Sequence, residues 1–380
     1  MRIGFDVAQT CTPRAGCGWA ADLLVRAIAE VAPEHDLYLY HHFGTWLNPD
    51  TSRGTHLSNG NTAEPLARLS VKAARELWTT VESGECQLPG DPDIVHANCY
   101  QAPKVGTAKL VYTVYDMSFW TYPEFTTEEN RLVCQRGTLD AVSRAAGLVF
   151  ISESARREFD SLFPGLCEKR GIRTKVALLG SRFPNVESSR DLIGGGNWLA
   201  IGSLEPRKNY EGLLDAFDCY WIKSKRKRKL TIAGGSGWKS QSLQQRIKEM
   251  EARGMVKYVG YIDDAELKRL YRDSLALLFP SHYEGFGLPV VEAMSQGCPV
   301  ITRRNTSLPE VGGLAAIYYN DTSEDLAERM LKLEIDSDFY LERSALALRQ
   351  ARQFDWKITA RNVLELYDEV LASRSRNLQD

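Results

Sequence analysis

Residues 275–301, LALLFPSHYEGFGLPVVEAMSQGCPVI, contain one complete strand–loop–helix–strand unit. An apolar strand ends before Pro280, a loop with two glycines follows, and Pro289 stands where a first helical turn begins. The predicted helix over 289–296 stops at Gly297 and leads into the next strand. A strand, a helix and a second strand in this order predict parallel strands joined by a crossover helix.

The same alternation continues along the whole chain. Short apolar, β-branched segments, from 2–7 to 315–318, are separated by helical stretches such as 18–31, 63–82 and 208–223. Twelve such strand segments exceed the number that one open, twisted sheet usually contains. A closed (β/α)8 barrel would need eight strands in about 250 residues and no linker, which this chain fits poorly.

A polar, proline-containing segment divides the chain near its middle. It covers 181–195, contains few strand-forming residues and runs into three glycines at 194–196. We therefore predict an α/β protein with two doubly wound, Rossmann-like domains, a linker over 181–195 and a cleft where the two sheets face each other.

Composition excludes several classes of protein. Of the 380 residues, 43% are hydrophobic and 25% are charged, so wholesale disorder is excluded. The net charge of −2 argues against a generally basic nucleic-acid binder. No apolar run is long enough for a membrane-spanning helix, and the first residues do not form a signal peptide. We expect a cytosolic or peripheral protein.

Cysteines and histidines give no metal or disulfide signature. The eight cysteines are scattered without a Cys-x-x-Cys pair, and the six histidines include no pair at the i, i+4 spacing of a helical metal site. We expect reduced thiols and no structural or catalytic metal.

The loop after Phe279 has the features of an anion site. The backbone N–H groups of the Gly285–Leu288 turn lie at a helix N-terminus, where anions bind readily. Glu284 precedes this turn and Glu292 lies about one helical turn inside the helix. Carboxylates at both ends of such a loop are suited to holding hydroxyls around a phosphate group. The whole string with this spacing is rare, so we favour this interpretation over two exposed glutamates beside a tight turn.

Two glutamates separated by seven residues, with Gly-Phe-Gly-Leu-Pro between them, resemble the donor-sugar motif of the family 4 retaining glycosyltransferases with the GT-B fold, also called group 1 glycosyltransferases. The resemblance is dense in the C-terminal half and thinner in the N-terminal half. Other similar segments are IGSLEPRKNYEGLLDAF (201–217), TIAGG (231–235), VGYIDDAEL (259–267), FISES (150–154) and FDW (354–356).

This resemblance implies a domain plan. It comprises an acceptor-side domain over 1–185, a nucleotide-sugar-binding domain over 195–355 and a terminal helix over 356–380 that crosses back to the first domain. It also implies retention of the anomeric configuration, a sugar nucleotide as donor substrate and no tightly bound cofactor or metal.

Arg207 and Lys208 follow a strand and open a helix, so their cations and the helix N–H groups point the same way. Arginine can bind phosphate with two hydrogen bonds and lysine acts as a point charge. We expect them to stabilise a departing nucleoside diphosphate, although a solvated helix start would also explain the pair.

The resemblance assigns further roles in the second domain. It implies that Glu284 holds donor-sugar hydroxyls, that Glu292 holds the ribose hydroxyls and that Tyr261 lies near the nucleobase. The remaining residues implied to contact the donor are Ser203, Gly285, Phe286, Gly287 and Leu288.

In the first domain, Gly16 and Gly18 form a Gly-x-Gly-x-x-Ala pattern that opens helix 18–31. This pattern mimics a dinucleotide fingerprint, and an NAD-dependent oxidoreductase is therefore a competing interpretation. The glycines lie well past the end of their strand, unlike a Rossmann turn. The resemblance implies instead a loop whose backbone approaches the donor diphosphate and the acceptor.

Tyr115 and Asp116 end the strand over 109–115. The family commonly has a His-Asp pair here, and Tyr115 occupies the histidine position. The resemblance implies a place near the donor sugar for both residues, whereas Asp116 could equally cap the following turn.

The run Lys223-Ser-Lys-Arg-Lys-Arg-Lys229 carries six cations in seven residues. Contact with anionic lipid or a lipid-diphosphate acceptor is one interpretation, with peripheral binding at the inner face of the cytoplasmic membrane. A solvated loop that complements the helix dipole is the simpler one.

The sequence thus predicts a retaining hexosyltransferase that acts on a glycan or lipid-linked saccharide in polysaccharide or glycoconjugate biosynthesis. The segment Leu204-Glu-Pro-Arg-Lys-Asn209 resembles the corresponding segment of bacterial mannosyltransferases. GDP-mannose is therefore the first expected donor and a UDP-hexose the second. A sugar-nucleotide epimerase and a non-catalytic scaffold of the same fold are more remote alternatives.

Overall fold

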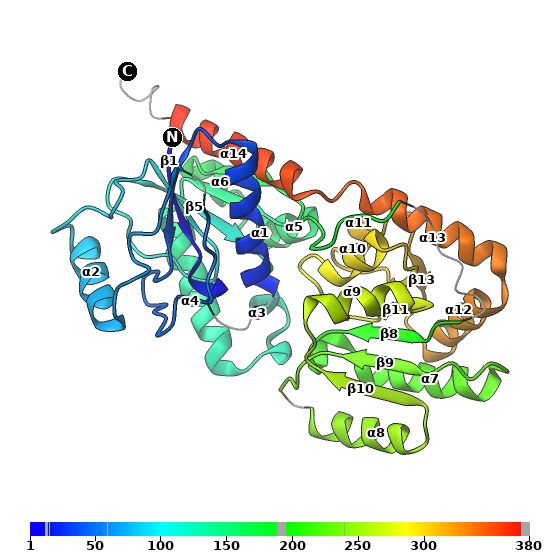
Figure 1. Cartoon of the computed structure of the whole chain (residues 1–380). Coiled ribbons are helices and arrows are strands. Elements are labelled where there is room, and N and C mark those ends of the chain that lie inside the picture. The colour runs from blue at the N-terminus through cyan, green and yellow to red at the C-terminus, as the bar shows by residue number, and fades with distance from the viewer. Residues whose placement is uncertain (12–13, 15, 59, 188–194, 239, 374–380) are drawn as a thin grey trace. The chain divides into compact units, whose positions relative to one another are not determined.

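The computed structural model describes residues 1–11, 14, 16–58, 60–187, 195–238 and 240–373. The chain forms two compact units (Figure 1). The first comprises Met1–Leu179 together with Asp355–Asp380, and the second comprises Gly180–Phe354. The terminal segment that follows Phe354 thus belongs to the same unit as the N-terminus.

A seven-stranded parallel sheet forms the centre of the first unit, with strand order β3-β2-β1-β4-β5-β6-β7. Such an order places crossover helices between neighbouring strands, as the alternating sequence predicts. The strands are β1 (Arg2–Asp6), β2 (Asp36–Tyr40), β3 (Thr62–Ala63), β4 (Ile94–Ala97), β5 (Lys109–Val114), β6 (Gly147–Phe150) and β7 (Arg173–Val176).

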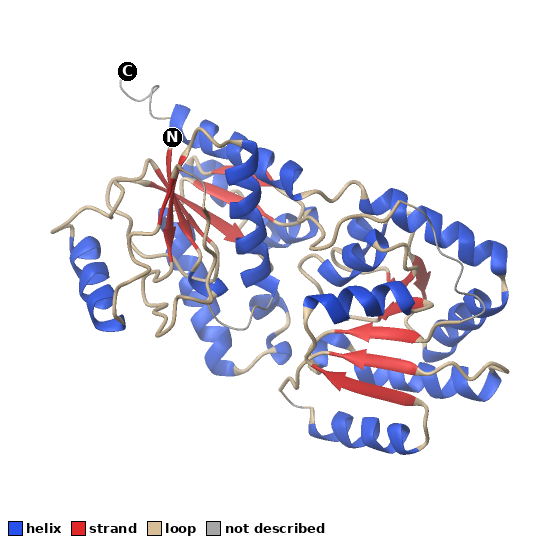
Figure 2. Cartoon of the chain, in the orientation of Figure 1, coloured by secondary structure: helices blue, strands red, loops and turns tan. Residues whose placement is uncertain are grey.

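Helices flank this sheet (Figure 2). The last of them, α14 (Trp356–Ala372), packs against α1 (Gly16–Val31) and the strands β5, β6 and β7. A buried hydrogen bond of 2.5 Å between Tyr367 Oη and His96 Nδ1 joins α14 to β4. The other helices are α2 (Val71–Ser83), α3 (Ser118–Thr121), α4 (Glu128–Arg144), α5 (Glu153–Leu162) and α6 (Leu166–Arg170).

The second unit is built on a six-stranded parallel sheet with strand order β10-β9-β8-β11-β12-β13. All four residues of β11 are buried, as expected for a parallel strand that is covered on both faces. The strands are β8 (Trp198–Ile201), β9 (Leu230–Ala233), β10 (Val256–Gly260), β11 (Ala276–Phe279), β12 (Val300–Arg303) and β13 (Ile317–Tyr319).

Side-chain caps set the start of several helices in this unit. Asp263 caps α9 (Asp264–Asp273), and Asp336 caps α13 (Ser337–Ala351). The remaining helices are α7 (Tyr210–Lys223), α8 (Gln241–Ala252), α10 (Leu288–Ser295), α11 (Leu308–Gly312) and α12 (Ser323–Ile335).

The two open, doubly wound sheets confirm the predicted α/β architecture, but one helix was predicted wrongly. The expected helix over 63–82 is instead the short strand β3 followed by α2, which starts only at Val71. The Ser70 hydroxyl accepts a hydrogen bond from Ala73 N at 3.2 Å and fixes that start. Pro65 lies in the intervening stretch, where a helix interior would not tolerate it.

Part of the segment predicted as a linker is packed against the second unit. Val186 N donates to Ser295 O at 2.9 Å, and Gln296 Nε2 donates to Pro184 O at 2.9 Å. Residues 181–187 therefore lie along the end of α10, whereas 188–194 lie outside the described residues.

Candidate active site

The loop between β11 and α10 is fixed by the segment that follows β12. Ser307 Oγ donates to Glu284 O at 2.9 Å and to Phe286 O at 2.8 Å, so one hydroxyl holds two carbonyls of the turn. Gly287 occupies the N-cap of α10 with φ of 107°, a conformation that favours glycine. Within the described residues, no side chain caps this N-terminus. The turn is the one predicted to bind an anion, and α10 begins at Leu288, one residue earlier than expected.

Glu284 is brought to the two cations that the sequence singled out. Lys208 Nζ lies 2.5 Å from Glu284 Oε1, and Arg207 Nη1 lies 2.8 Å from Glu284 Oε2. Both cations lie in a single 3-10 turn, Pro206–Lys208, and not in α7 as predicted. Helix α7 begins only after Asn209, whose side chain accepts a hydrogen bond from Gly212 N at 3.3 Å.

The cluster contains as many carboxylates as cations. Arg207 also pairs with Glu205, at 2.9 Å, a residue that no sequence pattern singled out. Burial by itself would raise the pKa of Glu284, but Lys208 and Arg207 outweigh it and lower the pKa to about 2. Burial also lowers the pKa of Lys208, and Arg207 adds to that shift while the glutamates oppose it. Two carboxylates thus face two cations in this cluster.

Glu292 belongs to a second cluster. It is fully buried, and its carboxylate accepts hydrogen bonds from Arg182 Nε at 2.5 Å, Arg182 Nη2 at 3.0 Å and Tyr271 Oη at 3.0 Å. Arg182 also pairs with Asp264 at 3.0 Å. This arginine lies in the segment predicted as a linker, so only its place beside α10 reveals it.

The other donor-contact residues differ in burial. Ser203 is exposed after β8, and Tyr261 is 68% exposed after β10. Both follow the carboxyl ends of parallel strands of the same sheet, with β9 between them, at the edge where open α/β sheets bind ligands. Gly285, Phe286 and Gly287 are buried, and the Phe286 ring packs against Phe354.

In the first unit, Gly16 and Gly18 form the first turn of α1, and not a loop before it. A Cβ at Gly18 would lie 2.8 Å from Gln9 O, so glycine permits this close approach of the backbone. Tyr115 Oη donates to Cys17 O at 3.5 Å. Burial raises the pKa of Tyr115 well above its usual value.

Asp116 has the geometry of a turn cap. Its carboxylate accepts hydrogen bonds from Ser118 N at 3.1 Å and Ser118 Oγ at 2.9 Å, at the start of α3. This arrangement matches the capping alternative.

Two residues of the basic segment 223–229 make structural contacts within the second unit. Arg228 is buried, pairs with Glu334 at 3.2 Å and donates to Gly196 O at 2.6 Å. Lys227 donates to the carbonyls of Trp221 and Ile222 near the C-terminus of α7. These contacts favour the dipole-complementing loop over a lipid site.

The described part of the chain contains one candidate metal cluster and no candidate membrane-spanning helix. Among those residues, one group of histidine, cysteine and acidic side chains could hold a metal ion: His41, His56 and Glu64, in the first unit. No helix there is both long and apolar enough to cross a membrane.

Residues 197–351 match the family model "Glycosyl transferases group 1". The chain is 31% identical to the O-antigen chain mannosyltransferase B of Escherichia coli over 267 residues, 68% of this chain and 70% of that protein. Among solved structures, the sucrose-phosphate synthase of Thermosynechococcus elongatus matches with a TM-score of 0.71 and 18% identity, covering 98% of this chain and 99% of that one. Anabaena Alr3699/HepE in complex with UDP and glucose matches with a TM-score of 0.68 and 18% identity, covering 97% and 100%. Both structures share the fold of this chain.

Proposed function

The chain belongs to the group 1 glycosyltransferases of the GT-B fold, and from this premise we propose that it transfers a mannosyl group from GDP-mannose with retention of the anomeric configuration. Its similarity to an O-antigen chain mannosyltransferase, over two thirds of each chain, supports mannose as the sugar. The acceptor in this proposal is a glycan or lipid-linked saccharide in polysaccharide biosynthesis.

The observation that carries the proposal is the cluster of Arg207, Lys208 and Glu284 beside the α10 turn. The oxygens of a diphosphate would accept hydrogen bonds from the two cationic side chains and from the N–H groups of the turn at Gly285–Leu288. Because Glu205 and Glu284 already balance the cations, the helix N-terminus supplies the attraction that the neutral cluster lacks. These electrostatic interactions become stronger as the leaving diphosphate gains negative charge.

Glu284 would accept hydrogen bonds from hydroxyls of the donor sugar, for which its ionised carboxylate is suited. Glu292 would hold the ribose hydroxyls. Since Arg182 and Tyr271 already bond both of its oxygens, this role requires lone pairs that those donors leave unused, or a shift of Arg182. Ser203 and Tyr261, both exposed, would face the nucleoside.

The chemical step would be attack by the acceptor hydroxyl on the anomeric carbon, on the face that the diphosphate leaves. The carbon–oxygen bond to the diphosphate breaks, a new glycosidic bond forms, and the acceptor proton passes to the departing diphosphate. No protein nucleophile is required. In the first unit, Gly16, Gly18 and Tyr115 would contact the substrates, and Asp116 would keep the neighbouring turn in place.

A UDP-hexose is the second candidate donor. Anabaena HepE, which shares the fold, has been solved in complex with UDP and glucose. The residues proposed to bind the diphosphate would not contact the base. The selection of GDP or UDP would therefore depend on the residues around Tyr261. In either case we propose a cytoplasmic enzyme that meets its acceptor in solution or at the inner face of the membrane, without nucleic-acid partners.

The test measures binding and turnover on the whole chain. Thermal unfolding is followed with GDP, UDP, ADP, NAD and the corresponding sugar nucleotides, each with and without EDTA. A ligand at 100 times its Kd should stabilise by about 2.7 kcal/mol, a shift of a few degrees. We expect a shift with GDP and GDP-mannose that survives EDTA, and an α-linked product by NMR with a saccharide acceptor.

Lys208→Met removes the ammonium and keeps most of the side-chain volume, so it should abolish this shift. Lys248→Met, at an exposed position on α8, is the matched control and should behave as wild type. A shift with UDP alone would replace the donor by a UDP-hexose. A shift that persists in Lys208→Met, or an inverted product, would overturn the proposed mechanism.

A further inference from the structure

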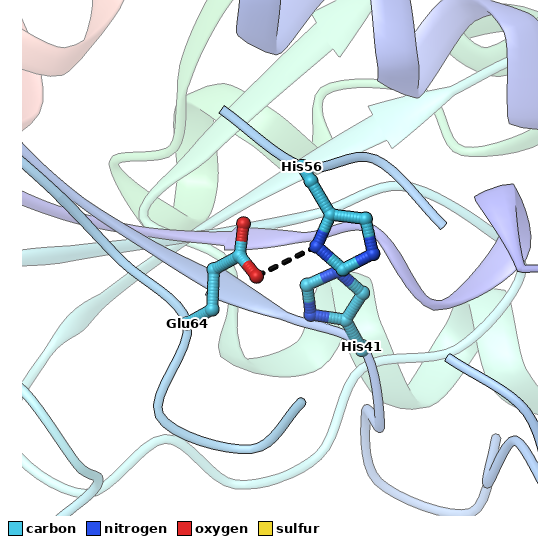
Figure 3. Close-up of side chains that lie close together, drawn as sticks. All are labelled: His41, His56 and Glu64. Carbon is cyan, nitrogen blue, oxygen red and sulfur yellow. Dashed lines mark hydrogen bonds and ion pairs between the residues drawn. The ribbon is translucent and has the colours of Figure 1, made fainter. Parts of the chain in front are cut away.

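Three side chains that could bind a metal gather in the segment between β2 and α2. His41 directly follows β2, and His56 and Glu64 lie fifteen and twenty-three residues further along. One ligand atom from each residue lies within 4.8 Å of the others. Figure 3 shows the two imidazole rings stacked with the Glu64 carboxylate at their edge, and the ring centroids are 4.8 Å apart.

The hydrogen bonds of His41 fix which of its nitrogens carries the proton. Its Nε2 lies 2.9 Å from Thr55 O, and a carbonyl oxygen only accepts, so Nε2 is the donor. His41 is 0% exposed, and burial favours the neutral ring. The lone pair then lies on Nδ1, which is buried and has no hydrogen-bond partner among the described residues. A buried imidazole lone pair without a donor is a feature that a ligand would explain.

His56 makes the same kind of backbone contact, but its Nδ1 has a partner. Its Nε2 lies 3.1 Å from Thr51 O and is therefore also the donor to a backbone carbonyl. Its Nδ1 faces Glu64 Oε2 at 2.7 Å (Figure 3). Histidines that bind metals donate their other ring N–H to a carbonyl or carboxylate in this way, which fixes the tautomer and the ring orientation.

We propose that His41 Nδ1, His56 Nδ1 and a carboxylate oxygen of Glu64 bind one divalent transition-metal ion of the zinc type. Two histidines and one carboxylate form a ligand set that zinc accepts, and a water molecule completes four-coordination on the side where His56 is exposed. Metal–nitrogen bonds of about 2.0–2.1 Å place tetrahedral ligands about 3.3 Å apart, so the three side chains move closer together on binding. The rings are stacked at 22°, and each Nδ1 lone pair lies in its ring plane, so the exposed His56 ring turns to point at the ion. The ion takes the place of the proton between His56 and Glu64.

The ion would join both ends of a long connection. Between β2 and α2 the described chain contains only the two-residue strand β3, and long connections without structure of their own are uncommon in compact domains. A metal bound by His41, His56 and Glu64 would hold this connection against the end of β2. The ligands lie fifteen and eight residues apart in succession, a spacing that matches no metal motif in the sequence.

The test uses the full chain, stripped with EDTA and then given Zn²⁺ or Co²⁺ alone. We expect one zinc per chain after desalting, by elemental analysis, a higher unfolding temperature with zinc, and a visible Co²⁺ absorption typical of four-coordination. Loss of one direct ligand in His56→Gln or Glu64→Gln should weaken binding by at least the about 10–100-fold that loss of an outer-shell partner costs. Both side chains lie partly at the surface, so these variants should fold.

His35→Gln, which removes an imidazole from the same unit but outside the cluster, is the matched control and should bind as wild type. Three outcomes would overturn the site. They are no retained zinc in wild type, equal binding in His56→Gln and wild type, or a Co²⁺ spectrum with thiolate charge-transfer bands, which would place the ion on cysteines. In each case the stacked rings and the His56–Glu64 ion pair are a polar contact only.

Discussion

The Lys208 ammonium and the Glu284 carboxylate, 76 residues apart in the chain, lie 2.5 Å apart in the second unit. One comes from the turn after β8 and the other from the turn after β11, and these two strands are neighbours in the sheet. The pairing keeps Glu284 ionised although it is buried, and it keeps the cations in place before a donor arrives. It also gives the two residues different expected effects on binding and on turnover.

Glu284→Gln should separate binding from catalysis. Without the carboxylate, Lys208 and Arg207 are less neutralised, so GDP should bind as tightly as in wild type or several-fold more tightly. Turnover of GDP-mannose should fall about 10–100-fold, because a charged hydrogen bond to the sugar is worth about 1.5–3 kcal/mol. Calorimetry with GDP and initial rates measure the two effects.

Glu249→Gln, at an exposed position on α8, is the control for that change and should leave both values unaltered. If GDP binding fell in parallel with turnover in Glu284→Gln, the carboxylate would organise the phosphate site and not hold the sugar.

Arg182→Met should destabilise the second unit by about 3 kcal/mol, since removing one partner of a buried ion pair leaves an uncompensated charge. The double variant Arg182→Met/Glu292→Met should recover part of that loss, because it removes the orphaned carboxylate as well. Urea unfolding of the single and double variants measures the difference. A double variant that is no more stable than Arg182→Met would show that packing, and not charge, makes the arginine important.

Tyr261→Ala should weaken nucleotide binding without affecting the fold. The ring is 68% exposed, so the free energy of unfolding should change by less than about 0.5 kcal/mol. Loss of an aromatic stack on a base costs about 1–3 kcal/mol, which predicts about tenfold weaker GDP binding. Pyrophosphate, which lacks the base, should bind both proteins equally, and a loss for both ligands would place Tyr261 at the phosphates.

The first unit should lose stability in acid through His96. Burial lowers the pKa of this histidine to about 3, below its ordinary value of 6.5. Between these two pH values the unfolded chain binds a proton at His96 that the folded chain does not bind. The free energy of unfolding therefore falls as the pH drops, by up to about 1.4 kcal/mol per pH unit. Denaturant unfolding of wild type and His96→Gln at pH 7 and pH 4 measures it.

The wild type should lose more stability than His96→Gln over that interval. Asp6 acts in the opposite direction, since burial raises its pKa to about 6 and its contribution is lost as the pH rises through that value. The comparison with His96→Gln cancels this effect, because Asp6 is present in both proteins. Equal pH dependence of the two proteins would contradict the predicted role of His96.

Much of the architecture could be predicted because it rests on local patterns. Alternating apolar strands and helices indicated two parallel α/β sheets, and the spacing of glycines and prolines placed the turn before α10 within one residue. Prediction failed over 63–82, where the helical pattern extended across Pro65, and only the cap at Ser70 sets the true start of α2. The distinction between a loop and a helical turn at Gly16 was missed in the same way, because such boundaries depend on hydrogen bonds.

By itself, the sequence determined the family, the two-sheet architecture and the turn that carries Glu284, because all of these follow from spacing within a few turns of chain. The tertiary structure alone decided which distant groups meet: Lys208 with Glu284, Arg182 with Glu292 across 110 residues, and His41 with His56 and Glu64. The physical reason is that the period of a helix or strand determines which face each side chain occupies. The partner of that side chain depends on which strands and turns become neighbours when the sheets assemble.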